Sequence, residues 1–219
     1  RSFAGRPANA GGAAREKRTM KDSGIVGEPF RAEPFWKVAG IDFRNLIWVA
    51  VALGIMVAAI VSDDEWWLRY VHVASGVLLT GADILLGFLI GPIIRRLGHE
   101  ARREFSLKLL PKTLFVMTTL GIMAPTSGWF LAVQQGYHEL AWPEFGWVAA
   151  ALAISAVLAL QGFVILLPSN LRAYLEMRKE APDFDRVGRI MRLYFWTVAS
   201  QGVMQVLIIV VMVKFATGI

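Results

Sequence analysis

The sequence predicts an all-α protein, a polytopic integral membrane bundle of five transmembrane helices. Three observations support this fold class. Of the 219 residues, 56% are hydrophobic, which exceeds the share in ordinary soluble domains. Five apolar runs approach the length of about 20 residues that a helix needs to cross a bilayer. Lys and Arg gather in alternate loops between those runs, as they do on the cytoplasmic side of membrane proteins.

Residues 1–34 are rich in Gly, Ala, Pro and charge and show no apolar period, which is typical of an extended, disordered tail. Because such a tail usually becomes ordered on another surface, we expect it to dock on a partner subunit. The alternative is packing on the chain's own cytoplasmic loops. Residues 35–44 predict a short interfacial helix whose aromatic and aliphatic side chains dip into lipid.

The five apolar runs lie near residues 46–61, 68–94, 109–133, 145–167 and 190–215. The first is short for a span unless it begins near Phe43, and the second is long enough to tilt. The N-terminal region and the loops after the second and fourth runs are basic, whereas residues 62–67 and 134–145 contain no Lys or Arg. We therefore predict a cytoplasmic N-terminus and an external C-terminus.

The second run contains two titratable residues, His72 and Asp83. On a helix they are separated by about 20° of rotation and about 16 Å of rise, so they share one face. The residues between and beyond them on that face are small or polar: Ser75, Gly76, Thr80 and Gly87. Since small residues allow helices to approach and polar ones bond across, this face is predicted to meet other helices. The opposite side, with Val71 and Phe88, is predicted to face lipid.

Asp83 is expected near the middle of the membrane. A charge there costs about 2.5 to 3.5 kcal/mol on insertion scales, so Asp83 should face protein and be protonated or paired. The candidate partners at similar depth are Gln161, Ser200, Gln201 and Gln205. A hydrogen bond among these would fix the bundle without chemistry. The alternatives are a proton or ion path and a contact with a quinone or another cofactor.

His72 is expected near the outer surface, as a packing residue or as a ligand. Its candidate partners are His138 in the external loop and the Pro125–Ser127 segment of the third run, where proline frees a carbonyl. A metal or haem b site would pair His72 with His138 or with Met123, since imidazole and thioether suit copper and haem. No cofactor is predicted outright; haem b and copper are the ones these residues would suit.

The second and fourth runs end alike, in "GFLIGPIIRRL" (87–97) and "GFVILLPSNLRAYL" (162–175). Each has Gly-Phe, apolar residues, a proline and then arginine, followed by a basic turn and another helix. Two such hairpins in the same orientation would be an internal repeat. The alternative is that the glycine packs, the proline is tolerated near a helix end and the arginine marks the inner border in each case independently.

Two stretches carry a family resemblance: "YVHVASGVLLTGADILLGFLIGPIIRRL" and "LLPKTLFVMTTLGIMAPTSGWFLAV". A helix with an early His and internal glycines ends in Pro and Arg, and the next helix carries Ser-Gly near its outer end. In this pattern residues 68–134 resemble the CopD-like and related uncharacterised bacterial integral membrane families. The resemblance implies a multi-pass protein of the bacterial cytoplasmic (inner) membrane, copper transport or haem binding, and His72 as the one residue carried over. The Trp-x-Gly-Gly that commonly follows the histidine is absent here.

Composition excludes several classes of function. The chain has no cysteine, which excludes disulfides, thiolate metal sites and haem attached through C-x-x-C-H. The net charge of +6 lies in loops beside apolar runs, which indicates contact with the membrane surface and not with nucleic acid. Without a nucleophile beside an acid/base pair, the sequence does not predict a free-standing enzyme, although a subunit of an oxidoreductase complex stays open.

Three functions remain. The preferred prediction is a non-catalytic subunit of a larger bacterial membrane complex, related to electron transfer or a membrane oxidase, which docks on other membrane subunits through residues 1–34 and the cytoplasmic loops. The second is an electron-transfer subunit that binds haem b or a quinone with His72. The third is a small copper or proton transporter that uses His72 and Asp83 as stations along one helix face.

Overall fold

The computed structural model describes residues 43–218, and this part of the chain is helical without any strand. The prediction of an all-α fold is therefore confirmed for these residues. The helices are α2 (Phe43–Val61), α3 (Glu65–Ile84), η2 (Leu85–Ile90), α4 (Gly91–Arg96), α5 (His99–Gln134), η3 (Tyr137–Glu139), α6 (Phe145–Leu160), η4 (Gln161–Leu166), α7 (Leu167–Met177) and α8 (Phe184–Ala216).

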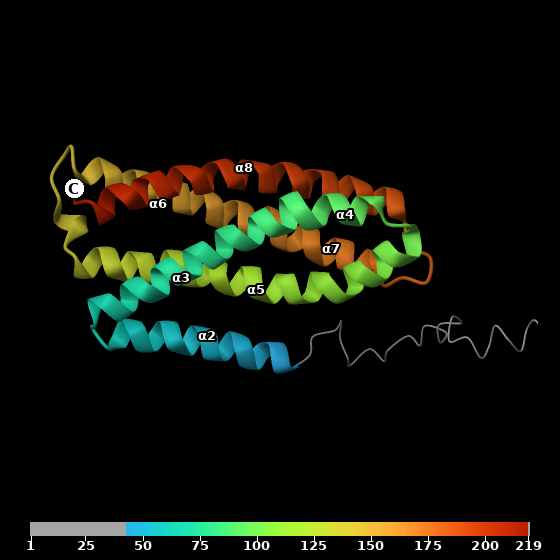
Figure 1. Ribbon diagram of the computed structural model, residues 1–219, viewed down its shortest axis with the longest axis horizontal. Helices are drawn as coiled ribbons and strands as arrows, with labels where there is room; N and C mark the ends of the chain where they lie inside the picture. The colour runs from blue at the N-terminus through green and yellow to red at the C-terminus, as the bar shows by residue number, and fades with distance from the viewer. Residues whose placement is uncertain (1–42, 219) are drawn as a thin grey trace, which may run out of the picture. The chain divides into compact units, whose positions relative to one another are not determined.

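Four continuous helices in the described part are long and apolar enough to cross a membrane: Glu65–Arg96, His99–Gln134, Phe145–Met177 and Phe184–Ala216. The first joins α3, η2 and α4, and the third joins α6, η4 and α7 (Figure 1). By length and composition the chain is a multi-pass membrane protein. The apolar part of α2, Leu46–Val61, is shorter than these four.

The helices extend further into the basic loops than the sequence predicts. α5 begins at His99 where residue 109 was expected, the helix after η4 continues to Met177 and not to 167, and α8 begins at Phe184 and not at 190. Hydropathy identifies only the apolar part of a helix. The helix itself can continue through Lys and Arg residues, because their long side chains reach water from its end. The tail and residues 35–42 of the expected interfacial helix lie outside the described residues.

Aspartates cap two of the helices that follow turns. Asp64 precedes α3 and accepts a bond of 3.1 Å from the backbone N–H of Trp67. Asp183 precedes α8 and accepts one of 2.9 Å from the backbone N–H of Arg186. Each satisfies a donor that the first turn of a helix leaves free. The bond from Arg186, with the positive charge of the nearby arginines, lowers the pKa of Asp183 from its ordinary value.

Two π-helical turns, η2 and η4, interrupt the second and fourth predicted runs just before Pro92 and Pro168. In each, the residue after the π turn donates its N–H to a carbonyl five residues earlier. A proline ring clashes with the carbonyl four residues before it, and the wider π turn relieves that clash. The likeness between the two run ends thus extends to backbone conformation, and proline explains it in both.

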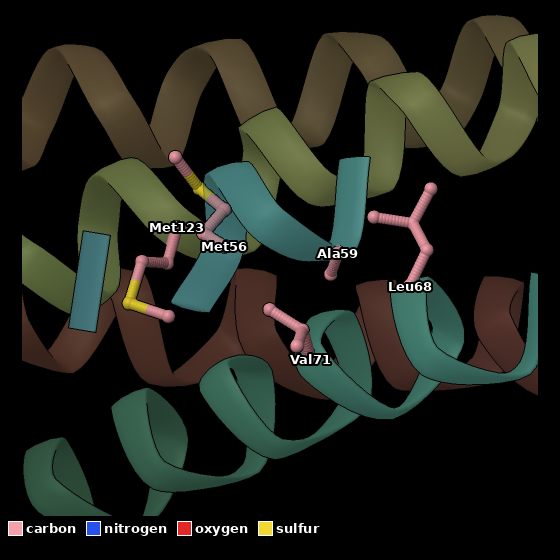
Figure 2. Close-up of a cluster of buried hydrophobic side chains, with 5 residues drawn as sticks. All are labelled: Met56, Ala59, Leu68, Val71 and Met123. Carbon is pink, nitrogen blue, oxygen red and sulfur yellow. The ribbon is translucent and has the colours of Figure 1, made fainter. Parts of the chain in front are cut away.

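A hydrophobic core is shared by α2, α3 and α5. Its buried members are Met56 and Ala59 of α2, Leu68 and Val71 of α3, and Met123 of α5 (Figure 2). Val71 was predicted to face lipid, and this is wrong: its side chain is only 4% exposed. The expectation failed because α2 packs against the part of α3 that contains Val71 and covers a side that was expected to meet lipid.

Two consecutive arginines of α5 cap the C-terminal ends of two other helices. Arg102 donates to two carbonyls at the end of α4, and Arg103 donates to one at the end of α7 and one just beyond it. The acceptors are Ile94, Arg95, Met177 and Lys179, at 3.3, 2.7, 3.0 and 2.7 Å. A guanidinium suits this role because its planar donors reach two unsatisfied carbonyls at once and its charge favours a helix C-terminus.

Candidate functional site

Polar side chains are buried along the length of the bundle, between its helices. In the described part they are Ser75, Asp83, Ser106, Thr119, Ser127, Ser169, Asn170, Glu176, Thr197, Gln201 and Gln205. Burial of such groups is unfavourable unless they are hydrogen-bonded, so their partners determine what they can do. Three groups of contacts follow: around His72, around Asp83 with the glutamines, and around Glu176.

His72 bonds to the third of the predicted runs. Its Nδ1 lies 2.9 Å from the backbone carbonyl oxygen of Ala124, one residue before Pro125. Because a carbonyl only accepts, Nδ1 carries the proton in this contact. The partner therefore lies beside the Pro125–Ser127 segment that the sequence named as a candidate, although it is a backbone atom and not a polar side chain.

Gly128 lets the His72 ring lie against the backbone of α5. A Cβ atom at position 128 would stand 2.7 Å from Cε1 and 2.9 Å from Nδ1 of His72, closer than real side-chain contacts allow. Ser127 beside it is fully buried and bonds to its own helix, at 2.6 Å from the carbonyl of Met123. The sequence analysis did not single out Gly128; the signal was its place one turn after Ala124 on the same face.

The candidate metal and haem ligands have different surroundings in the structure. Met123 is buried in the hydrophobic cluster with Met56 and Val71. His138 lies on η3, with its Nε2 at 3.6 Å from a carboxylate oxygen of Glu139. From Gly128 to the end of α5 the helix rises about 9 Å, which separates the His72 ring from that turn. In residues 43–218 no group of three or more His, Cys, Asp or Glu side chains is placed to hold a metal ion.

Asp83 bonds to the last predicted run. Its Oδ2 accepts a bond of 2.6 Å from Nε2 of Gln205 on α8, and the two side chains are 5% and 4% exposed. Of the four candidate partners, Gln205 is therefore the one that bonds to Asp83. Tyr194 is within electrostatic range of Asp83 and shares a hydrogen bond with Asn170. Asp83 therefore belongs to a polar zone on the α8 side of the bundle.

The other glutamines connect α6 and η4 to α8. Gln161 donates to the hydroxyl of Ser200 at 3.1 Å. Gln201 donates to the carbonyl of Leu158 at 3.2 Å, just before the helix changes from α to π form. The side chains named in the sequence analysis are thus brought together, in pairs that each join two spans.

Two acceptors in this zone stay unsatisfied. In the described part of the chain, Oε1 of Gln161 and Oε1 of Gln205 are buried without a hydrogen-bond partner. An unpaired buried acceptor costs about 1 to 3 kcal/mol, so each marks a place where a donor would be stabilised. Both belong to side chains whose amide nitrogens already bond across the bundle.

The small residues of the predicted stripe do not all pack tightly. At Gly87 a Cβ would lie 3.3 Å from Cγ1 of Val198, so η2 approaches α8 closely there. At Gly76 a Cβ would meet no atom within 4 Å, and Thr80 is only half-buried. Ser75 is buried but bonds within its own helix, to the carbonyl of His72 at 3.0 Å. Of Ser75, Gly76, Thr80 and Gly87, it is therefore Gly87 at which another helix comes close.

A buried carboxylate near the end of α7 was not predicted. The side chain of Glu176 is 7% exposed and lies 2.8 Å from Nζ of Lys179 and 3.4 Å from a guanidinium nitrogen of Arg186. These contacts close the turn between α7 and α8 over the carboxylate. Sequence alone gives no sign of this burial, because Glu176 lies in a charged stretch that is typical of an exposed loop.

A cavity of about 250 Å³ lies beside the turn between α2 and α3. Its lining residues are Ile60, Asp63, Leu68, Phe130, Val133 and Gln134. Gln134 donates to a carboxylate oxygen of Asp63 at 2.7 Å, so the polar side chains at this rim already bond to each other. Neither His72 nor Asp83 lines the cavity.

No family model matches the chain, and no curated protein or solved structure matches it. The resemblance of residues 68–134 to CopD-like membrane families accordingly stays a prediction. The contacts of His72, Asp83 and the buried glutamines are therefore the basis for assigning a function.

Proposed function

We propose that this chain is a non-catalytic integral membrane subunit of a larger bacterial membrane complex. One observation supports this role most directly: His72, Asp83 and Gln161 each bond to a group on another span. Such bonds between transmembrane helices stabilise the bundle by about 0.6 to 2 kcal/mol each. This use accounts for the burial of the polar groups without any chemistry of their own.

In this proposal α2 is the first of five spans, the N-terminus is cytoplasmic and the C-terminus is external in the bacterial inner membrane. The burial of Met56 and Ala59 against α3 and α5 supports a spanning role for α2. Residues 1–34 and the basic loops dock on the partner subunits. The likeness of residues 68–134 to CopD-like families directs the proposal to an electron-transfer or membrane-oxidase assembly.

Purification of the tagged chain from its own membranes in mild detergent is expected to yield other subunits at a fixed stoichiometry. Deletion of residues 1–34 is expected to remove them, while the chain still inserts, because the four long apolar helices lie outside the deleted segment. Mass spectrometry of the purified species gives its composition. Replacement of residues 1–34 by a Gly/Ser linker of equal length serves as the control for length. If the full chain and the variant without residues 1–34 both purify as a single chain with no other subunit, the proposal is wrong.

Transport of protons is a second candidate, and the unsatisfied acceptors favour it. Asp83 lies within a membrane-spanning helix, and Oε1 of Gln161 and Oε1 of Gln205 are unpaired in the same polar zone. A carboxyl group that exchanges a proton next to free acceptors is the arrangement that proton relays use in membranes. In the described part of the chain, the buried acidic side chains are Asp83 and Glu176, and Glu176 is already paired with Lys179 and Arg186.

In proteoliposomes with an internal pH dye and an imposed membrane potential, Asp83→Asn is expected to abolish proton uptake. Asparagine keeps the shape and can still bond to Gln205, but it cannot release a proton. Glu104→Gln is the matched control, since Glu104 is an exposed carboxylate on α5. Equal uptake by wild type and Asp83→Asn would remove this candidate and leave the subunit role, whose own test is independent of flux.

A further inference from the structure

Arginine and aromatic side chains meet where α4 lies beside α8, at the basic end of two spans. The guanidinium carbon of Arg95 lies 4.7 Å from the centre of the Phe195 ring. Phe195 in turn contacts Trp196 edge to face, with ring centres 6.1 Å apart. Arg192 precedes these two residues by three and four positions, so it neighbours both on the helix surface. We call these four residues, Arg95, Arg192, Phe195 and Trp196, the arginine-aromatic site.

No carboxylate among the described residues is paired with the positive charges of this site. In the described part, neither Arg95 nor Arg192 has a carboxylate within 4.0 Å, whereas Arg186, Lys108 and Lys179 each have one. Both unpaired arginines are exposed. Arg95 contacts the Phe195 ring, and Arg192 precedes Phe195 by about one turn of α8, so an anion at this place would be attracted by both charges.

The surroundings of the site are apolar and exposed. Trp196 is 68% exposed, the position of an indole that rests at the level of lipid headgroups. From the site toward the membrane centre, both helices present exposed apolar side chains: Phe88, Leu89, Ile93, Val203 and Val206. A ligand that fits must therefore carry an anionic head and long apolar chains.

We propose that the arginine-aromatic site binds an acidic phospholipid of the phosphatidylglycerol type. Its phosphate lies between Arg95 and Arg192, which offer planar donors that match phosphate oxygens. Its glycerol contacts Trp196, and its acyl chains follow the exposed surfaces of η2 and α8. Basic pockets between spans at this level are suited to such headgroups. Phe195 fixes the Arg95 side chain by cation–π contact, so less freedom is lost on binding.

Native mass spectrometry of the purified chain in mild detergent, titrated with phosphatidylglycerol or phosphatidylcholine, tests the proposal. Wild type is expected to retain phosphatidylglycerol at least tenfold more tightly than phosphatidylcholine. Arg95→Gln with Arg192→Gln is expected to abolish this preference, because without its two positive charges the site no longer distinguishes a headgroup with a net negative charge from a zwitterionic one. Phe195→Leu keeps both charges and should reduce the preference several-fold.

The matched control is Arg172→Gln with Lys112→Gln, which removes the same number of exposed charges from other helices. It should leave the lipid preference unchanged, and circular dichroism should show equal helix content for all variants. An equal loss in the control pair would assign the preference to overall surface charge and overturn the site. Full displacement of the lipid by millimolar glycerol phosphate would identify a free phosphate as the ligand and overturn the lipid proposal. An absence of lipid preference in the wild type would also overturn it.

Discussion

Gly128→Ala is expected to destabilise the bundle by about 1 to 3 kcal/mol, the range for overpacking a well-filled interior. The added methyl would overlap the His72 ring, which lies against α5 at this point. Gly121→Ala, about two turns earlier on the same helix, meets no atom within 4 Å and is the matched control. Since alanine favours helix over glycine by about 1 kcal/mol, Gly121→Ala should be neutral or stabilising. Thermal unfolding in detergent measures both.

A second substitution tests whether the ring is the cause. His72→Ala alone loses the bond to Ala124 and should cost about 1 kcal/mol. Combined with Gly128→Ala, it removes the overlap, so the double variant should be more stable than Gly128→Ala alone. If the two costs simply add, the ring does not pack where the structure places it.

Gln205→Leu is expected to destabilise the bundle by about 1 to 3 kcal/mol, because it leaves the carboxyl group of Asp83 buried without its partner. Asp83→Leu with Gln205→Leu should recover much of that loss, since two apolar side chains need no bond. Gln201→Leu is the control on the same helix. Its acceptor, the carbonyl of Leu158, also receives the backbone N–H of Gln161, so this change should cost less.

The cycle of single and double variants at Asp83 and Gln205 gives their coupling energy directly. Asp83→Asn belongs in the same series, because asparagine keeps a bond to Gln205 and should cost less than Asp83→Leu. Unfolding by detergent or heat, followed by circular dichroism, supplies each free energy. Additive costs for the two leucine variants would show that the side chains act independently, contrary to the 2.6 Å contact.

The sequence predicted the helices and their buried faces, because the apolar runs have the length of a membrane-spanning helix and the small and polar residues recur with the period of a helix. It placed Asp83 on the face that meets other spans and limited its partners to four side chains. It did not identify Gln205 as the partner, because Gln201 lies on the same face one turn away. Which of the two meets Asp83 depends on how far α8 is shifted along its axis relative to α3. The π turn before Pro92 was also missed, because proline breaks a helix in several ways and the sequence does not say which.

His72 shows a different limit. The sequence identified the Pro125–Ser127 segment as the region of its partner. The acceptor is the backbone oxygen of Ala124, and a backbone acceptor cannot be recognised from residue type. Gly128 was indistinguishable from Gly121 in the sequence, because a glycine that makes room for a ring and one that faces open space read alike. The burial of Glu176 likewise depends on how the turn after α7 folds back.

Adjacent residues of α5 hold the ends of two other helices. Arg102 bonds to carbonyls of α4, which precedes it in the chain, so this contact can form once α4 and α5 are both present. Arg103 bonds to the carbonyl of Met177, 74 residues further along the chain, so this contact also requires α7. Two neighbouring side chains therefore connect a contact between consecutive helices with one that closes only after a distant helix has been added.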